Sequence, residues 1–600
     1  AILTNTPIYS DDYAMHYAQC RAVKKYISMF LSCWAYDPFY LAGMPNGTLG
    51  NADNKAWEVF YFLFSGVLGE GFAFKAYVVL FFLAYPVLLY AAARNFGLSR
   101  KIGLIAAGMG LLFFHLSLCI SMVAWGMISY VFVCFFSIYV LSLWWRMLES
   151  FSITRCILFA VCLSIMVMMH ILAVVHMGIP MAVMYLYRAR HLPVRHQGML
   201  IGSVIGGLAI NSFWLWPVVD FFNDQTTRPE NYEFTLQIKN VFEPLKVYIQ
   251  QRRSTDHCMP VLNNTFFETL LLLFGVAGLY LWRKENRKAL WHAFTAGICT
   301  IFLIAYYGSH TTLFPPLQPE RYTIPLSLLL LVPASVAVAR VLQAFVHRAS
   351  LPTKFFIGAL TFVLLYQPVV RPFGIFYKYK PYRLHTEMPE PITRLLDFLK
   401  YNTDREGRIL IEDSEYTRAR PDHQYFGGHY PAIFPEYVQR EYLSGPRPLY
   451  PVKHSYASFT NGVLFERDIT AYTDQELEEA FNLFNVRWIV AWNQKSKDVF
   501  SQNPRSISKL CDIDKFSVYT VNRQPSFFIK GSGKLRAEYN RIELTDVHPE
   551  DGEVIISYHW MKKLRAIPET TLEPVSLGGD PIGFIKIKNP PRAFVIVNTY

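Results

Sequence analysis

Charged residues are scarce in this chain: Asp, Glu, Lys and Arg make up 17% of its 600 residues, whereas 52% are hydrophobic. This composition excludes an ordinary water-soluble protein of this length. The nine cysteines lie at scattered spacing, which excludes a zinc or redox motif. A Cys20–Cys33 disulfide is possible by spacing, but free thiols are the favoured interpretation. Internal repeats and low-complexity segments are also missing.

What the chain has instead is a series of apolar runs that ends at about residue 373. A helix needs roughly 20 apolar residues to cross the hydrocarbon core, so the pattern predicts a polytopic α-helical membrane domain of about ten spans within 73–373. The candidate spans lie near 73–92, 102–122, 126–145, 156–171, 173–187, 199–217, 266–282, 290–307, 322–343 and 355–371.

The net charge of +12 is concentrated in alternate short loops, which argues against nucleic acid as the partner. The connections near 123–125, at 172 and at 309–319 contain no Lys or Arg. Because basic loops stay in the cytoplasm, these three connections are predicted to face outward. Residues 1–72, the loop 218–265 and everything after 373 are then outside as well. Residue 1 needs a route to that face, so we expect a further N-terminal span to precede it.

The water-exposed parts of the chain have patterns of their own. Residues 1–72 are predicted to form a first extracytoplasmic loop with amphipathic helices, one of them starting after Ser10 as N-cap. Residues 374–525 alternate helical and strand patterns, which indicates an extracytoplasmic α/β domain. Residues 526–600 contain strands and turns only, which indicates a β-rich, sandwich-like module.

An acidic pair, Asp11-Asp12, lies just upstream of the apolar series. Carboxylates beside a membrane are costly if they face lipid, so we expect them to face a water-filled site. Favourable helix-start charges are the simpler explanation for such a pair. Adjacent helical residues point about 100° apart, so only one of the two can be a catalytic base. The sequence does not rank them.

This pair and several later phrases resemble the C-type (GT-C) polytopic membrane glycosyltransferases, which include oligosaccharyltransferase catalytic subunits, protein O-mannosyltransferases and arabinosyltransferases. Within this class the chain most resembles the bacterial multispan type. The phrases are Asp37-Pro38-Phe39-Tyr40-Leu41-Ala42-Gly43, His170 at an outer helix junction, Pro319-Glu320-Arg321-Tyr322, Asn485-Val486-Arg487-Trp488-Ile489-Val490 and Asn540-Arg541-Ile542. The Trp-Trp-Asp motif of oligosaccharyltransferases is missing, so transfer to Asn side chains is not expected.

The resemblance implies a hexosyl- or pentosyltransferase in a bacterial inner (plasma) membrane, with its active site and C-terminal domain outside. Its donor would be a polyprenyl-phosphate-linked sugar, its acceptor a glycan, lipid or protein, and its stereochemical outcome inversion. One of Asp11 and Asp12 would be the base, and Arg321 would bind the donor phosphate. If a divalent cation such as Mg²⁺ or Mn²⁺ takes part, the same two carboxylates would hold it.

Further candidate substrate-binding residues each have a simpler alternative. His16 lies one turn after Asp12 and could orient a group there, or be an interfacial histidine. His170 could contact substrate or be a packed core residue. Asp220 and Asp224 could supply a second site carboxylate or merely solubilise their loop. Asp37 is expected to cap a loop rather than to react.

Two other function classes remain open from sequence. A lipid-glycan transporter or flippase would have charged or broken helices at mid-membrane and internal repeats, neither of which is evident. A non-catalytic envelope-assembly membrane protein would have no need of the acidic pair.

Overall fold

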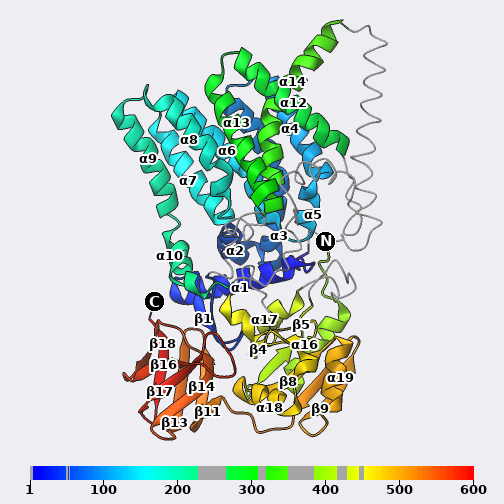
Figure 1. Ribbon diagram of the computed structural model, residues 1–600, viewed down its shortest axis with the longest axis vertical. Coiled ribbons are helices and arrows are strands. Elements are labelled where there is room, and N and C mark those ends of the chain that lie inside the picture. Colours follow the sequence, from blue (N-terminus) through cyan, green and yellow to red (C-terminus); the bar gives the residue numbers. More distant parts are fainter. Residues whose placement is uncertain are drawn as a thin grey trace.

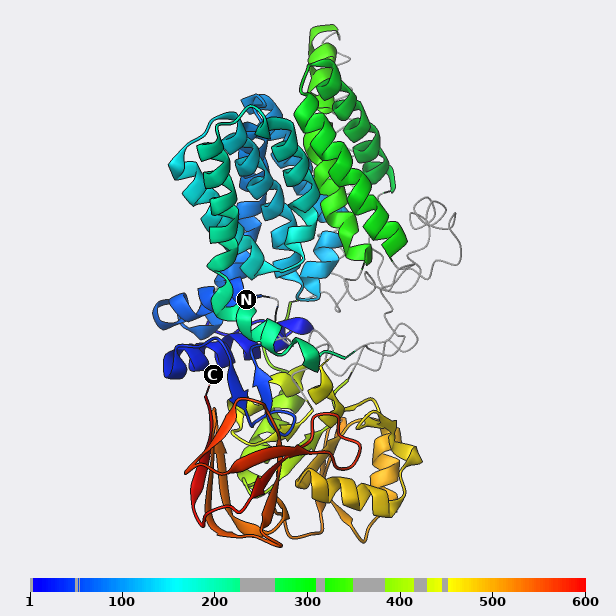
Figure 2. The same ribbon diagram turned by 60° about the vertical axis from the view of Figure 1, so that its left-hand side comes forward.

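The computed structural model describes residues 4–48, 52, 54–226, 265–308, 319–348, 384–414, 429–444 and 452–599. A long helical region occupies one end of the molecule, and a domain with strands and short helices occupies the other (Figures 1 and 2). The helical region comprises α3 (Glu70–Asn95), α4 (Arg100–Leu116), α5 (Leu118–Ala124), α6 (Ile128–Glu149), α7 (Ile153–Met169), α8 (Ala173–Ala189), α9 (Val194–Ala209), α10 (Ser212–Asp220), α12 (Thr265–Lys284), α13 (Lys288–Tyr307) and α14 (Thr323–Arg348).

Among the described residues, four helices are long and apolar enough to cross a membrane: α3, α6, α13 and α14. Two bent pairs, α4 with α5 at 60° and α9 with α10 at 64°, raise this number to six if each pair is one span. The predicted total of about ten stays a prediction, and its last span, 355–371, lies outside the described residues.

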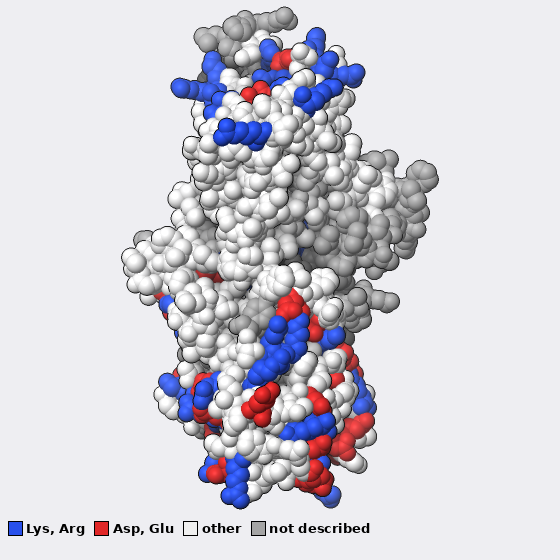
Figure 3. Space-filling view, turned by 90° about the vertical axis from the view of Figure 1, so that its left-hand side faces the viewer, with Lys and Arg blue, Asp and Glu red and all other residues white. Residues whose placement is uncertain are grey.

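Charge separates along the long axis of the molecule as a membrane protein requires. Figure 3 shows Lys and Arg gathered at the far end of the helical region, then a broad band nearly free of charge, then a mixed acidic and basic surface on the C-terminal domain. Such a band suits a hydrocarbon layer. The structure thus confirms the predicted fold class, an apolar helical region followed by an α/β and β-rich soluble part.

Helices α1 (Asp12–Phe30) and α2 (Lys55–Leu68) lie between these two regions (Figure 1). The prediction that Ser10 caps α1 is wrong. Asp11 is the N-cap residue, and the Ser10 hydroxyl instead accepts a 2.7 Å hydrogen bond from the backbone N–H of His385. That bond ties the start of α1 to the C-terminal domain. Cys20 and Cys33 are both free and buried.

The α/β domain is built on a five-stranded sheet in the order β4-β3-β8-β10-β9. Strand β3 pairs in parallel with β4 and β8, so the carboxyl ends of these strands meet at one edge. The strands are β3 (Arg408–Ile411), β4 (Tyr442–Leu443), β8 (Val486–Ala491), β9 (Ile507–Ile513) and β10 (Phe516–Val521). The helices are η8 (Tyr430–Ile433), α16 (Glu390–Asn402), α17 (Phe434–Tyr437), α18 (Asp474–Leu483) and α19 (Gln494–Gln502). A small three-stranded sheet adds β5 (Phe459–Thr460), β6 (Val463–Leu464) and β7 (Arg467–Asp468).

The C-terminal module is a sandwich of two four-stranded antiparallel sheets, in the orders β11-β14-β17-β16 and β12-β13-β18-β15. Both sheets supply alternate apolar side chains to one core, including Ile542 and Ile596 from one sheet and Ile556 and Ile585 from the other. The strands are β11 (Phe528–Lys530), β12 (Ser532–Glu538), β13 (Arg541–His548), β14 (Glu553–His559), β15 (Leu564–Ile567), β16 (Thr571–Val575), β17 (Phe584–Lys588) and β18 (Phe594–Asn598).

Arg408 joins the sandwich to the α/β sheet. Its guanidinium is fully buried, pairs with Glu441 at 2.9 Å and donates a 2.6 Å hydrogen bond to Ser557 on β14. It also lies over the ring of Tyr558, 4.6 Å from the centroid. Removing one partner of such a buried pair leaves a charge without solvation, which costs about 3–5 kcal/mol. The two soluble modules are therefore fixed to each other by a polar contact as well as by apolar packing.

Candidate active site

The acidic pair lies where the apolar helices end. The backbone N–H of Asp12 donates a 3.3 Å hydrogen bond to the carbonyl of Trp125, in the connection between α5 and α6. The Tyr13 hydroxyl donates a 2.7 Å bond to the carbonyl of Val123 in the last turn of α5, next to this connection. This is one of the three connections predicted to face outward. The pair thus sits at the end of the helical region that faces the C-terminal domain.

The backbone at the pair is strained. Asp11 has φ 47° and ψ −129°, a conformation that L residues rarely adopt and that costs about 1–3 kcal/mol. Gly126 lies against it with φ +92°, and a Cβ at that position would approach the Cβ of Asp12 to 2.8 Å. Only glycine fits there, because both the backbone conformation and the contact exclude a side chain. Strain of this kind is maintained by surrounding structure and clusters at functional sites.

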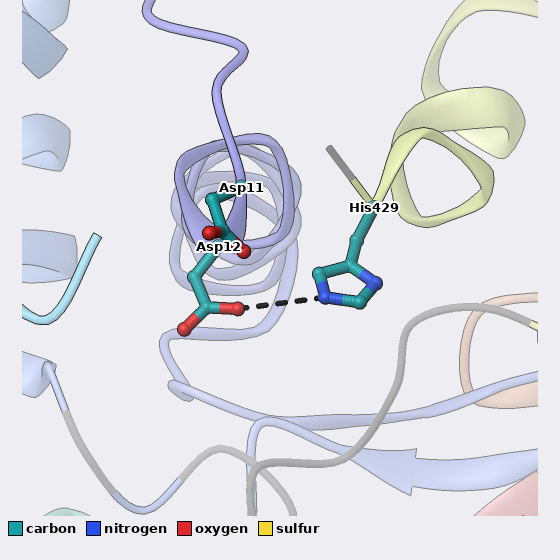
Figure 4. Close-up of side chains that lie close together, drawn as sticks. All are labelled: Asp11, Asp12 and His429. Atoms are coloured by element: carbon teal, nitrogen blue, oxygen red, sulfur yellow. Dashed lines mark ion pairs between the residues drawn. The ribbon is translucent and has the colours of Figure 1, made fainter. Parts of the chain in front are cut away.

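A histidine from the C-terminal domain completes the group. His429, just before η8, points its Nε2 at Asp12, 3.6 Å from Oδ1 (Figure 4). One ligand atom from each of Asp11, Asp12 and His429 lies within 4.8 Å of the others. The backbone N–H of His429 also donates to the carbonyl of Asp11, at 3.4 Å. Sequence reasoning did not find His429.

The other ring nitrogen of His429, Nδ1, faces a further carboxylate. Asp413 Oδ2 lies 3.6 Å from His429 Nδ1, and its side chain is 5% exposed. Asp413 follows Glu412, which is held at the carboxyl end of β3 by four donors: the backbone N–H groups of Gly462, Trp492 and Asn493 and the Ser496 hydroxyl, at 2.7–3.0 Å. Burial raises the pKa of Glu412 to about 6 despite these bonds. Glu412 thus anchors the loop that aims Asp413 at His429.

These neighbours favour the charged form of His429. Burial alone would lower its pKa, but Asp413 and then Asp12 and Asp11 outweigh burial and raise the pKa to about 9. At neutral pH His429 is therefore an imidazolium between carboxylates. It offsets their mutual repulsion and holds Asp12 in a fixed position.

This arrangement predicts a pH-dependent stability difference between the wild type and His429→Gln. A raised folded-state pKa stabilises the protein fully below the unfolded value near 6.5, and the contribution is lost as pH rises through about 9. We expect His429→Gln to lower the free energy of unfolding by about 3 kcal/mol at pH 6 and by much less at pH 9.5. The difference in melting temperature between variant and wild type, in a chelator-containing buffer, follows this change. The exposed His548→Gln is the matched control and should show no such trend. An unchanged gap at the two pH values would contradict the imidazolium.

Helix α1 is clamped to the C-terminal domain by a second set of charges. Glu436 on α17 is 2% exposed and pairs with Arg21 at 3.2 Å and with Lys25 at 2.8 Å. Both cations lie on α1, two to four turns after the acidic pair. The clamp fixes the helix in the same domain that carries His429, so the distance between Asp12 and His429 does not depend on one contact alone.

Arg321 and His170, both predicted from sequence, share one aromatic neighbour. The Arg321 guanidinium lies over the ring of Tyr130, 5.7 Å from its centroid, and the His170 ring meets the same ring edge-on at 5.1 Å. Tyr130 is in the first turn of α6, four residues after Gly126, so this cluster borders the segment that contacts Asp12. His176, which sequence reasoning missed, also meets Tyr130. It is 2% exposed, and neither of its ring nitrogens has a hydrogen-bond partner among the described residues.

His16 and Asp37 are buried, and both make polar contacts with neighbouring side chains. His16 Nδ1 lies 3.2 Å from the Asn54 amide nitrogen, and its ring packs on Trp57. Asp37 accepts hydrogen bonds from the Tyr26 hydroxyl and the Asn46 amide, so it organises its loop as expected. In the structure His16 supports the packing of α1 on α2.

Asp220 and Asp224 lie apart from the Asp11, Asp12 and His429 group. Asp220 forms an ion pair with Lys562 of the sandwich. Burial raises the pKa of Asp224, and Lys453 and Lys562 counter the rise. Both carboxylates thus help dock α10 and the short η2 turn (Phe222–Asp224) onto the C-terminal domain. Their predicted part in substrate binding stays a prediction.

No family model matches the chain, and no curated protein matches it in sequence. Solved structures do match. The chain is similar in structure to archaeal oligosaccharyltransferase. A crystal structure of the Archaeoglobus fulgidus enzyme tethered to an acceptor peptide is 13% identical, with a TM-score of 0.47 over 82% of this chain and 66% of that one. The chain therefore spans slightly less than two thirds of that enzyme.

Two further solved structures are similar to a comparable degree. AglB from Archaeoglobus fulgidus, with an inhibitory peptide and a dolichol-phosphate, is 11% identical with a TM-score of 0.48 over 82% of this chain and 66% of that one. Apo ArnT from Cupriavidus metallidurans is 13% identical with a TM-score of 0.46, over 86% of this chain and 94% of that chain. Oligosaccharyltransferase catalytic subunits belong to the class that the sequence resembles.

Proposed function

We propose that this protein is an integral membrane glycosyltransferase that moves a sugar from a polyprenyl-phosphate donor to a hydroxyl of a glycan, lipid or protein acceptor. One observation carries the proposal: the strained acidic pair is hydrogen-bonded onto the end of the apolar helices and faced by His429 from the polar domain. A lipid-borne donor and the polar hydroxyl of an acceptor can meet at such a boundary. The alternating basic loops support an outer-face position for this boundary, in a bacterial plasma membrane.

The reaction balances with one carboxylate as base. The acceptor hydroxyl gives its proton to Asp11 or Asp12, and its oxygen forms a bond to the anomeric carbon of the sugar. The bond from that carbon to the phosphate oxygen breaks, and its electron pair leaves with polyprenyl phosphate. A single displacement of this kind inverts the anomeric centre. The second carboxylate and the imidazolium of His429 hold the base in position.

The leaving phosphate needs a cation, and Arg321 is placed to supply it. Arg321 lies beside Tyr130, at the same end of the helices as the acidic pair. A guanidinium can bind two phosphate oxygens at once, and its charge stabilises the negative charge that develops as the sugar leaves. The buried His176 next to the same ring adds two nitrogens that the described protein groups do not satisfy. This favours a polar ligand at this place.

Asp11, Asp12 and His429 can also hold a divalent cation. The 3.6 Å between His429 Nε2 and Asp12 Oδ1 lies within the range of about 3–4 Å that separates two ligands of one ion. His429 also presents its other nitrogen to Asp413, as metal-binding histidines commonly do. A bound Mg²⁺ or Mn²⁺ would help neutralise the donor phosphate. Since His429 is charged at neutral pH, it would first have to release its proton.

The experiment that tests this function measures a product common to every sugar and acceptor. The full chain, reconstituted in vesicles, is given a panel of radiolabelled polyprenyl-phosphate sugars together with acceptor-containing membrane extract, and released polyprenyl phosphate is quantified. We expect release with one donor that depends on the extract. Movement of labelled donor between leaflets with its glycosidic bond intact would instead favour a transporter. No release with any donor would favour an assembly protein.

A further inference from the structure

A second polar site lies at the opposite end of the helical region, among the basic loops. A cavity of about 580 Å³ lies there between the ends of four helices. Residues from the ends of α3, α6 and α8 and from the start of α13 line it. The positive-inside rule places this end in the cytoplasm, so the cavity is on the other side of the membrane from the acidic pair.

The cavity is strongly basic. Four cations line it, Arg146, Arg188, Arg287 and Lys288, against one carboxylate, Glu149. Glu149 already pairs with Arg188. Arg287 donates to the backbone carbonyls of Phe96 and Gly97, at 2.9 Å and 3.2 Å, and so joins two loops. Arg146 and Lys288 are exposed and make no such structural contact among the described residues. Two cations are thus left to face a ligand.

The start of α13 adds backbone donors to the same cavity. This helix has 20 residues, and no side chain caps its N-terminus. Its first three residues, Lys288, Ala289 and Leu290, all line the cavity. The N–H groups of a first turn have no partner within their own helix, and the helix dipole makes them favourable toward negative charge. A cavity with two available cations and an uncapped helix start is suited to a phosphate group.

We propose that this cavity binds a phosphate group, carried by an anionic membrane lipid or by a soluble phosphate compound. The aromatic rings of Trp145 and Tyr187 line it as well. Aromatic side chains of this kind mark the level of lipid headgroups. The site would tie the ends of α3, α6, α8 and α13 together by a shared anion. It does not depend on the proposed sugar transfer.

The test compares two double variants of the full chain that each lose two cations at the same end of the molecule. Arg146→Gln with Lys288→Gln empties the cavity of its available charges. Arg100→Gln with Lys101→Gln is the matched control, because both residues are exposed near the start of α4 and neither lines the cavity. Protein from vesicles of phosphatidylcholine and phosphatidylglycerol, about 4:1 by moles, is analysed for retained lipid by native mass spectrometry. In a second arm, melting midpoints are measured with inorganic phosphate.

We expect the cavity variant to retain phosphatidylglycerol roughly 30-fold more weakly than the wild type, and the control variant to behave like the wild type. That result assigns the site to a lipid headgroup. Stabilisation by inorganic phosphate without lipid selectivity, lost only in the cavity variant, assigns it to a soluble phosphate compound. Equal losses in both variants would show only a general basic surface, and no binding in either arm would show that no phosphate group is held there. Either result would overturn the site.

Discussion

Replacing both carboxylates of the acidic pair by amides, Asp11→Asn with Asp12→Asn, is expected to lower sugar transfer by at least about a thousandfold. An amide has the shape of a carboxyl group but cannot accept the proton of the acceptor hydroxyl. It also removes Asp12, 3.6 Å away, as a charged partner of the His429 imidazolium and leaves only Asp413. The measurement is the rate of polyprenyl phosphate release by protein that is equally expressed and equally folded.

A matched control separates chemistry from loss of charge. Glu478 and Glu479 are an adjacent, exposed acidic pair on α18 of the C-terminal domain. Their replacement by Gln also removes two negative charges, but away from the proposed site. That variant should keep wild-type transfer. The single variants Asp11→Asn and Asp12→Asn then identify the base, which should show the larger loss. Wild-type transfer by the double Asn variant would refute the proposed site.

The position of the acidic pair could be predicted because local patterns determine it. Short loops without Lys or Arg marked the helix ends that are predicted to face outward, and the pair precedes the first predicted span. The structure places Asp12 against Trp125, in one of these loops. Strands β3, β8, β10, β14 and β17 were equally predictable from short buried runs. Strands β9, β12 and β16 were not, since their exposed faces interrupt the apolar pattern.

The partners of the pair could not be predicted because they come from more than 400 residues away. His429 lies in a short segment with no helical or strand period, and its role arises only when the C-terminal domain docks on α1. One signal was available. Glu412 and Asp413 directly follow a buried strand, and the carboxyl ends of parallel strands commonly form sites. Acidic residues alone are less informative, since Asp220 and Asp224 looked similar in sequence and lie beside Lys562 and Lys453.

Arg321→Gln is the other change with a large expected effect. If Arg321 stabilises the leaving phosphate, its loss should lower kcat by about 100- to 1,000-fold, because the charge develops mainly in the transition state. Arg321→Lys keeps the charge but not the two-pronged geometry, so it should lose about tenfold. Both constants, kcat and KM for the donor, are measured with the donor that supports release in the wild type.

A structural role would leave a different pattern. Arg321 also lies over Tyr130, a contact worth about 0.5–2 kcal/mol, so its loss could act through packing alone. Tyr130→Leu removes that contact and keeps the guanidinium. Arg340→Gln removes a cation from α14, the helix that follows Arg321, where Arg340 pairs with Glu285. Catalysis by Arg321 predicts a small loss for Tyr130→Leu and none for Arg340→Gln. If Tyr130→Leu reproduces the full loss of Arg321→Gln, then Arg321 only holds the helices in place and some other group must meet the phosphate.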